Sequence, residues 1–265
     1  MNILFIGDIF GRPGRNTVTH LLKSLREQHK IDFVIANAEN IRHGKGVSES
    51  HLSEMQKAGV DFFTSGNHVY KNKDIIPLMD DPKLPLLRPA NYPEGVPGRG
   101  YEIVKIDKMK PVLVINLLGR VFMRENTDCP FRVVDKILKE HENKDLSATI
   151  VDFHAEATSE KVALGHYLDG RVTALLGTHT HVPTADERIL ENGTAYQSDV
   201  GFVGPLNSVI GSEKDPVIEQ FITQMPIKYE VAGGPTIFNA TKIEIDDKTK
   251  RAISIERIQH TVDSF

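Results

Sequence analysis

Short apolar segments alternate with amphipathic segments along most of this 265-residue chain, and this alternation limits the folds open to it. The apolar segments have the length of strands; they lie at residues 2–7, 31–38, 60–66, 148–153 and 172–177. The segments between them carry apolar residues at helical spacing; they lie at residues 13–28, 48–59, 131–143 and 159–170. Strands that are apolar throughout are buried on both faces, so the pattern predicts an α/β fold with a largely parallel sheet covered by helices.

The remaining strand-like segments predict a second sheet. Residues 101–107 and 111–119 are separated by three residues, which predicts a hairpin. Further strand-like segments follow at residues 193–204, 227–246 and 251–260. We expect this C-terminal part to complete a second sheet packed on the first, within a single domain that spans residues 1–265.

Composition excludes several classes of protein. Hydrophobic residues make up 40% and charged residues 26% of the chain, which is typical of a globular protein, and the net charge of −4 disfavours direct nucleic-acid binding. A lone cysteine, Cys129, excludes an internal disulfide and fits a reducing compartment. The N-terminal apolar run is interrupted at Asp8, which predicts a strand and not a signal peptide. Because no apolar run approaches the ~20 residues that span a bilayer, we expect a cytoplasmic protein without membrane contact.

Polar residues with metal-binding side chains follow five of the apolar runs. They are Asp8, Glu39 with Asn40, Asn67 with His68, His154, and the pair His179 and His181. In α/β folds ligands bind beyond the carboxyl ends of the strands, so we expect these residues to meet at one edge. The final His-x-His pair would present two neutral imidazoles to a transition metal.

Each of these positions also has a purely structural interpretation. Asp8 could cap the helix that follows it, and Asn40 would suit a turn. Asn67 and His68 could form a helix entry, and His154 could be an ordinary core histidine. Five strand ends that carry such residues together favour a metal centre over five separate explanations.

The donor atoms restrict the kind of metal centre. Oxygen and nitrogen donors without a thiolate point away from iron–sulfur clusters and structural zinc sites. The donors exceed what one tetrahedral ion takes, so we predict two ions bridged by the Glu39 carboxylate. Two ions roughly 3.5–4 Å apart clamp the attacking and leaving oxygens of a phosphoryl displacement, and a bridging water becomes a hydroxide nucleophile at neutral pH. Asp152 and Glu156, which flank His154, are candidates to orient the ligands.

The five strand-end motifs resemble those of the calcineurin-like metallophosphoesterases. The matching segments are GD at 7–8, EN at 39–40, GNH at 66–68, FH at 153–154 and GTHTH at 177–181. Two departures are present, because Phe10 stands where the superfamily's Asp-x-His motif has its histidine and Glu39 stands where the bridging acid is usually Asp. Both departures resemble the YmdB-type bacterial branch, as do the segments IGDIFGRPGR, NAEN and DFHAEATSEK.

This resemblance implies a layered α/β/β/α sandwich of two packed mixed sheets that holds two transition-metal ions. Iron and manganese are the first choices, with zinc and cobalt as alternatives. Carried over by position, one ion would be held by Asp8, Glu39, Asn40 and His181, and the other by Glu39, Asn67, His154 and His179. His68 would be the catalytic general acid that protonates the departing oxygen, a role for which histidine is suited because an imidazole can both hold and release a proton near neutral pH.

The implied function is hydrolysis of 2′,3′- or 3′,5′-cyclic nucleotides to nucleoside monophosphates by attack of a metal-bridging hydroxide. Three alternatives stay open: a broad-specificity phosphatase, a nuclease, and a metal-containing regulator whose hydrolysis is incidental. The expected partners are a cyclic nucleotide or another phosphodiester and, from the resemblance, further copies of the chain in a homodimer or homotetramer.

Overall fold

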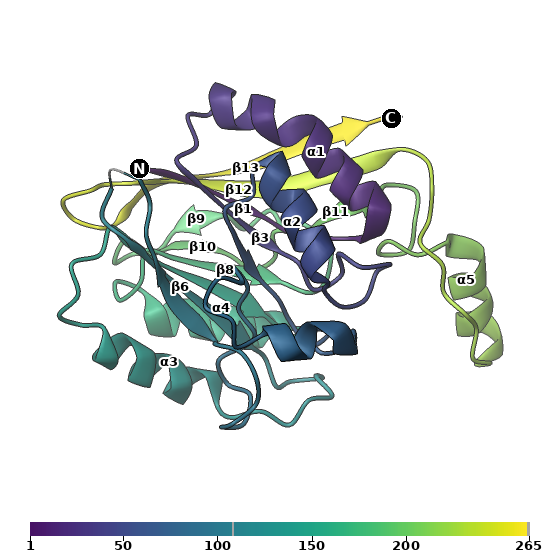
Figure 1. Ribbon diagram of the computed structural model, residues 1–265, viewed down its shortest axis with the longest axis horizontal. Coiled ribbons are helices and arrows are strands. Elements are labelled where there is room, and N and C mark those ends of the chain that lie inside the picture. The colour runs from purple at the N-terminus through teal and green to yellow at the C-terminus, as the bar shows by residue number, and fades with distance from the viewer. Residues whose placement is uncertain (108, 264–265) are drawn as a thin grey trace.

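Two β-sheets lie face to face in the computed structural model, which describes residues 1–107 and 109–263 (Figure 1). The first sheet contains β1 (Asn2–Ile6), β2 (Asp8–Ile9), β3 (Phe33–Asn37), β4 (Phe62–Thr64), β11 (Phe202–Pro205), β12 (Thr236–Ile245) and β13 (Ala252–Val262). Its order is β2-β11-β12-β1-β3-β4, with β13 paired to β12. Strands β1, β3 and β4 are parallel, whereas β12 runs antiparallel to β1.

The second sheet has the order β5-β6-β7-β8-β10-β9. Its strands are β5 (Tyr101–Val104), β6 (Val112–Leu118), β7 (Ala148–His154), β8 (Ala174–Thr178), β9 (Arg188–Ile189) and β10 (Ala195–Gln197). β6, β7, β8 and β10 are parallel to one another. β5 pairs antiparallel with β6 at one edge of the sheet, and β9 pairs antiparallel with β10 at the other. The predicted hairpin is confirmed as β5–β6, and both sheets are mixed.

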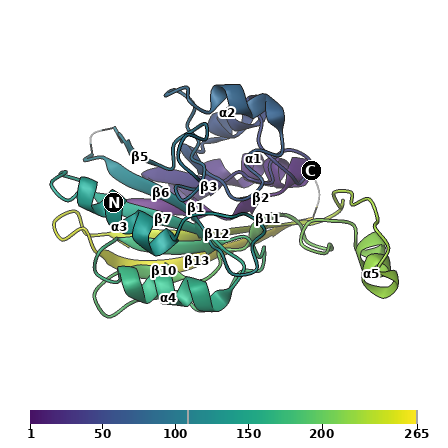
Figure 2. The same ribbon diagram turned by 90° about the horizontal axis from the view of Figure 1, so that it is seen from below.

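Helices cover the outer faces of the two sheets (Figures 1 and 2). They are α1 (Gly11–Gln28) and α2 (Glu49–Ala58) over the first sheet, and α3 (Pro130–Glu140) and α4 (Thr158–Leu168) over the second. A 3-10 helix, η1, spans Lys73–Leu78. The remaining helix, α5 (Lys214–Thr223), stands apart from the stacked layers in both views. No helix of the described ranges is long and apolar enough to cross a membrane.

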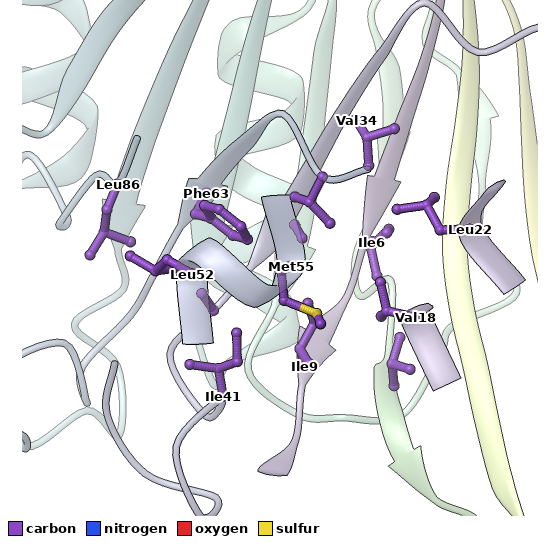
Figure 3. Packing of buried hydrophobic residues seen from close by; sticks show 14 of the residues in the cluster. Ile6, Ile9, Val18, Leu22, Val34, Ile41, Leu52, Met55, Phe63 and Leu86 are labelled. Carbon is purple, nitrogen blue, oxygen red and sulfur yellow. The ribbon is translucent and has the colours of Figure 1, made fainter. Parts of the chain in front are cut away.

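Three apolar clusters fill the three spaces between the four layers. Leu22 of α1 and Met55 of α2 pack on Ile6 and other side chains of the first sheet (Figure 3). Between the sheets, side chains such as Phe5 face side chains such as Ile150. The third cluster joins α3 and α4 to the outer face of the second sheet. The chain therefore has the expected α/β/β/α layering, because alternate residues of each strand enter different cores.

Of the expected C-terminal strands, β10 joins the second sheet as predicted, but the other three do not. β11, β12 and β13 join the first sheet, and the second sheet is built from the middle of the chain. β12 pairs with β1 from Asn2↔Glu244 to Ile6↔Ala240, so it covers the open edge of an apolar strand that needs hydrogen-bonded neighbours on both sides. Its side chains serve two cores, since Phe238 packs toward α1 and α2 while Ile243 packs between the sheets.

Candidate metal centre

The polar residues at five strand ends meet where the carboxyl ends of the two sheets adjoin. The first sheet brings Asp8, Glu39, Asn40, Asn67 and His68, and the second sheet brings His154, His179 and His181. Contacts between the two groups are direct, because His154 Nε2 of β7 lies 3.1 Å from Glu39 Oε2 beyond β3. The parallel strands place these ends at one edge, as the sequence pattern predicted.

Glu39 lies at the middle of this group, with a side chain that is 1% exposed. Its Oε2 atom accepts a hydrogen bond from the backbone N–H of His68 at 3.2 Å and faces His154. Its Oε1 atom lies 3.2 Å from His68 Nδ1 and accepts from Asn40 Nδ2 at 3.2 Å. The two carboxylate oxygens therefore face different side chains, His154 at Oε2 and both Asn40 and His68 at Oε1, which is the arrangement that a bridging ligand requires.

Glu39 and two imidazoles on one side of it could hold an ion. One ligand atom each from Glu39, His154 and His179 lie within 4.8 Å of one another. The closest of these contacts joins His179 Nδ1 and His154 Nε2 at 3.0 Å. Asn67 follows the same strand end as His68, and its Nδ2 atom donates to Glu125 Oε1 at 3.5 Å.

A second group surrounds Asn40 and His181. Asn40 Nδ2 lies 3.0 Å from His181 Nε2, and His181 Nε2 lies 3.9 Å from Asp8 Oδ1. The other oxygen of Asp8, Oδ2, accepts from the backbone N–H of His179 at 3.3 Å. The His-x-His pair thus divides, since His179 joins the group around His154 and His181 joins the group around Asp8 and Asn40.

Two oxygen atoms in this region indicate that the residues fit metal ions. Asp8 Oδ1 and Asn67 Oδ1 are buried and have no hydrogen-bond partner among the residues that the structure describes. Buried polar atoms are nearly always paired, and an unpaired carboxylate oxygen is costly. A cation bound to these oxygens and to the imidazoles would remove that cost, and such oxygen and nitrogen donors suit divalent transition metals.

Burial and close charges shift the pKa values of the acids and of one histidine. Burial would raise the pKa of Glu39, but His154 and His68 hold it well below its ordinary range. Burial would lower the pKa of His154, but Glu39 raises it to about 9. Burial, with Glu39 and Asp199 nearby, holds the pKa of Asp8 well above its ordinary range against the opposing effect of His154.

The pKa values of both histidines of the His-x-His pair are lowered. Burial and the adjacent His154 lower the pKa of His179 to about 3. Burial also lowers the pKa of His181, although its hydrogen bond to the Ile210 carbonyl opposes the shift. Both rings are therefore neutral at physiological pH, which is the form that binds a metal ion.

A hydrogen-bonded chain holds the His154 ring. His154 Nδ1 lies 2.9 Å from Thr178 Oγ1, and this hydroxyl donates to Asp152 Oδ1 at 2.7 Å. The Asp152 carboxylate also accepts from Asn37 Nδ2 at 3.0 Å and from the Thr64 hydroxyl. Asp152 was a candidate to orient a ligand, and it reaches His154 through Thr178, which leaves Nε2 facing Glu39.

The other two imidazoles have supports of their own. Glu156, the second candidate to orient a ligand, places Oε2 at 3.1 Å from His179 Nε2. His181 Nδ1 donates to the Ile210 carbonyl oxygen at 2.8 Å. Phe202 stacks on the His181 ring at 5.2 Å between centroids, and Phe10 meets its edge at 5.6 Å. Phe10 therefore packs on the ring of His181, a candidate ligand, at the position where the superfamily has a further histidine.

The sequence patterns missed several of these supports. Thr178 and Phe202 lie inside or beside apolar strands, where nothing distinguishes them from ordinary core residues. The Ile210 carbonyl belongs to the backbone, so no side-chain motif could indicate it. Asp199 does carry a signal, since it follows β10 just as the candidate ligands follow their own strands.

Comparisons with known proteins place the chain in a family. A family model described as YmdB-like protein matches residues 4–258. A curated relative from Bacillus subtilis (strain 168), named 2′,3′-cyclic-nucleotide 2′-phosphodiesterase, is 47% identical over 259 residues, which cover 97% of this chain and 96% of the relative.

Solved structures share the fold. The crystal structure of a novel phosphatase from Mycoplasma pneumoniae superposes with a TM-score of 0.93 at 37% identity, covering 100% of this chain and 94% of that one. A 5′-nucleotidase precursor from Thermus thermophilus superposes with a TM-score of 0.56 at 9% identity, covering 98% of this chain and 54% of that one. The second likeness shows the fold alone, which is the predicted metallophosphoesterase-like sandwich.

Proposed function

Because this chain belongs to the YmdB-like protein family, we propose that it is a dinuclear metal-dependent phosphodiesterase that opens cyclic nucleotides to nucleoside monophosphates. We take 2′,3′-cyclic nucleotides as the first substrate class, since the 47% identical Bacillus subtilis relative is named for them. The observation that carries the proposal is the buried, unpaired Oδ1 atom of Asp8 beside the Glu39 carboxylate and three imidazoles. Such a cluster is stable around cations and costly without them.

We propose the two ligand sets that the family resemblance implies, and contacts between most of their members support them. Asp8, Glu39, Asn40 and His181 would hold one ion. Glu39, Asn67, His154 and His179 would hold the other. When bound, two such ions stabilise charge on the phosphoryl oxygens and activate water at neutral pH. We propose iron or manganese, with zinc and cobalt as alternatives, and a homodimer or homotetramer as the assembly.

Protein groups would manage the protons of the reaction. His68 Nδ1 faces Glu39 Oε1 at 3.2 Å and Asn40 Oδ1 at 3.0 Å, so an N–H at this atom donates to one of them. That bond leaves Nε2 to carry the proton that the departing sugar oxygen takes up. The oxygen of water forms the new bond to phosphorus as the bond from phosphorus to the sugar oxygen breaks. The side chain of His68 is 23% exposed, so its ring is accessible to a substrate.

A substrate panel tests this proposal. Purified protein loaded with Mn²⁺ is assayed on 2′,3′-cyclic AMP, 3′,5′-cyclic AMP, AMP and a short RNA. We expect the highest kcat/KM on the 2′,3′-cyclic nucleotide, and we expect Glu39→Gln to abolish turnover while Glu140→Gln, an exposed carboxylate on α3, does not. Preference for AMP would favour the broad phosphatase, a second candidate that the Mycoplasma pneumoniae phosphatase structure supports. If the metal-loaded protein turned over none of these substrates, the remaining candidate would be a metal-containing regulator.

A further inference from the structure

The turn that carries the His-x-His pair has a strained backbone. His179 has a φ of 104° and His181 a φ of 65°, although neither residue is a glycine. Side chains disfavour this region, so such conformations persist only where neighbouring groups hold them. Besides the bonds of His179 N–H to Asp8 and of His181 Nδ1 to the Ile210 carbonyl, two contacts of Thr180, between the two histidines, hold this turn.

The two contacts of Thr180 end on one buried carboxylate, that of Asp199. Its Oδ2 atom accepts from the Thr180 backbone N–H at 3.0 Å and from the Thr180 hydroxyl at 2.8 Å. The same oxygen lies 2.7 Å from Lys161 Nζ of α4, and both side chains are nearly inaccessible, at 1% for Asp199 and 2% for Lys161. A buried ion pair is a weak source of stability, because desolvation offsets its attraction, but it fixes groups in place.

The other oxygen of Asp199 reaches the first sheet. Oδ1 accepts from the Gly201 backbone N–H at 2.8 Å, and the Gly201 carbonyl accepts from the Asp8 backbone N–H at 3.1 Å. One carboxylate therefore connects the turn after β8 with the strand that carries Asp8. Its two oxygens bind Thr180, which follows β8 of the second sheet, and Gly201, which precedes β11 of the first sheet.

From these contacts, we propose that Asp199, held by Lys161, is the positioning residue that keeps His179 and His181 in register with Asp8. This role deepens the proposed function and rests on it, because it assigns a cause to the spacing between ligands of the two sheets. Neither residue has a place in the ligand sets or in the proton transfer described above.

The variant Asp199→Asn tests this role with little change in shape. An amide has one accepting oxygen, so it cannot accept from both Thr180 N–H and Gly201 N–H, and one of these bonds is lost. Because the single variant leaves the Lys161 ammonium buried and unpaired, the double variant Lys161→Met/Asp199→Asn removes that charge and keeps the experiment interpretable if the single variant misfolds. Asp135→Asn is the matched control, since Asp135 pairs with Arg171 at 2.6 Å in an exposed ion pair on α3.

Two measurements follow on the full chain. Hydrogen–deuterium exchange of chelator-treated protein reports on the turn itself, and we expect the peptide around Thr180 to exchange at least several-fold faster in both Asp199 variants. Calorimetric titration with Mn²⁺ reports on the ligands, and we expect the dissociation constant to rise about 10–100-fold, with the Asp135→Asn control unchanged.

The possible results separate this role from the proposed function. Wild-type exchange and wild-type Mn²⁺ affinity in the folded double variant would overturn the positioning role and leave the phosphodiesterase proposal intact. Faster exchange with unchanged Mn²⁺ affinity would also overturn it, because the turn would then be free to move without displacing the ligands. If the wild-type chain binds Mn²⁺ but hydrolyses no cyclic nucleotide, the substrate class proposed above fails, and the exchange and Mn²⁺ affinity of the Asp199 variants still decide the positioning role.

Discussion

At the scale of single residues, the chemistry depends on which imidazoles carry a proton. His179 and His181 have lowered pKa values and are neutral, whereas the pKa of His154 is raised to about 9 by Glu39. His68 differs from all three because its ring contacts the other described residues through Nδ1 alone, at Glu39 Oε1 and Asn40 Oδ1. The four rings therefore divide into three that suit metal binding, one of them after losing a proton, and one that suits proton transfer.

Replacing His68 with Gln tests the proton transfer. Glutamine can still donate to Asn40 or Glu39, but it cannot protonate a departing alkoxide. We expect kcat on 2′,3′-cyclic AMP to fall by about 10²–10⁴ while the metal content stays at the wild-type level. A substrate with a nitrophenolate leaving group should lose far less activity, because that group departs without a proton. Equal losses on both substrates would argue against an acid role.

The raised pKa of His154 predicts how stability depends on pH in the metal-free protein. Unfolded histidine titrates near pH 6.5, so the stabilisation from the Glu39–His154 pair is complete below about pH 6.5 and is lost as pH rises through about 9. Asp8, whose pKa is also raised, can only act in the same direction. In urea titrations with chelator present, the free energy of unfolding should fall by up to about 1.4 kcal/mol per pH unit across this window. His154→Gln should flatten the profile, and a flat wild-type profile would contradict the assignment.

At the scale of elements, the ends of the strands matter more than their interiors. The turn after β4 brings Gly66 against the centre of the site, where a Cβ atom would lie 2.2 Å from Glu39 Oε2 and 2.3 Å from His154 Nε2. Glycine is required here for space. The strand can therefore deliver Asn67 and His68 only because this position has no side chain.

Gly66→Ala should consequently displace Glu39 or His154. We expect the Mn²⁺ dissociation constant to rise at least tenfold, with a loss of unfolding free energy of about 1–3 kcal/mol from overpacking. Gly233→Ala is the matched control, because a Cβ there meets no atom within 4 Å. Isothermal titration and urea unfolding measure the two effects. If Gly66→Ala bound Mn²⁺ with wild-type affinity, the displacement of Glu39 or His154 that the added Cβ causes would not affect metal binding, and the expectation would be wrong.

The elements that could be predicted from the sequence are those with strong local patterns. The amphipathic segment at 48–59 appears as α2, ending at Gly59 with a φ of 112°, and the hairpin at 101–119 appears as β5–β6. The strand-end residues also come together as expected, because parallel strands share one edge. The sequence could not predict which sheet β12 joins. The side chains of β12 alternate between two apolar cores, a pattern that would fit a strand of either sheet, and the pairing with β1 determines which sheet it joins. Supports such as Thr178 depend on contacts between distant segments, which leave no local pattern.

At the scale of the whole molecule, the candidate ligands belong to two sheets that pack through a shared apolar core. Bound ions would therefore connect the sheets as well as the residues. Ligands that bind only the folded state stabilise it by mass action, by about 2.7 kcal/mol when the free ion is at a hundred times its dissociation constant.

Metal removal should therefore lower stability. We expect a chelator to decrease Tm and to make Tm depend on Mn²⁺ concentration after the metal is restored, as differential scanning calorimetry would detect. Glu39→Gln should remove that concentration dependence, because it takes away the ligand shared by both sets. A Tm that changes neither with chelator nor with Mn²⁺ would argue against ions that connect the two sheets.

The division of ligands between two sheets also sets an order of events during maturation. In the unfolded chain His179 and His181 are near neighbours, but Asp8 and Glu39 are separated from them by more than half of the sequence. No partial chain emerging from the ribosome can assemble the set before β8 has formed and the sheets have closed. Metal binding would thus follow the closing of the two sheets, and bound ions would reflect the metal pool of the compartment in which the sheets close.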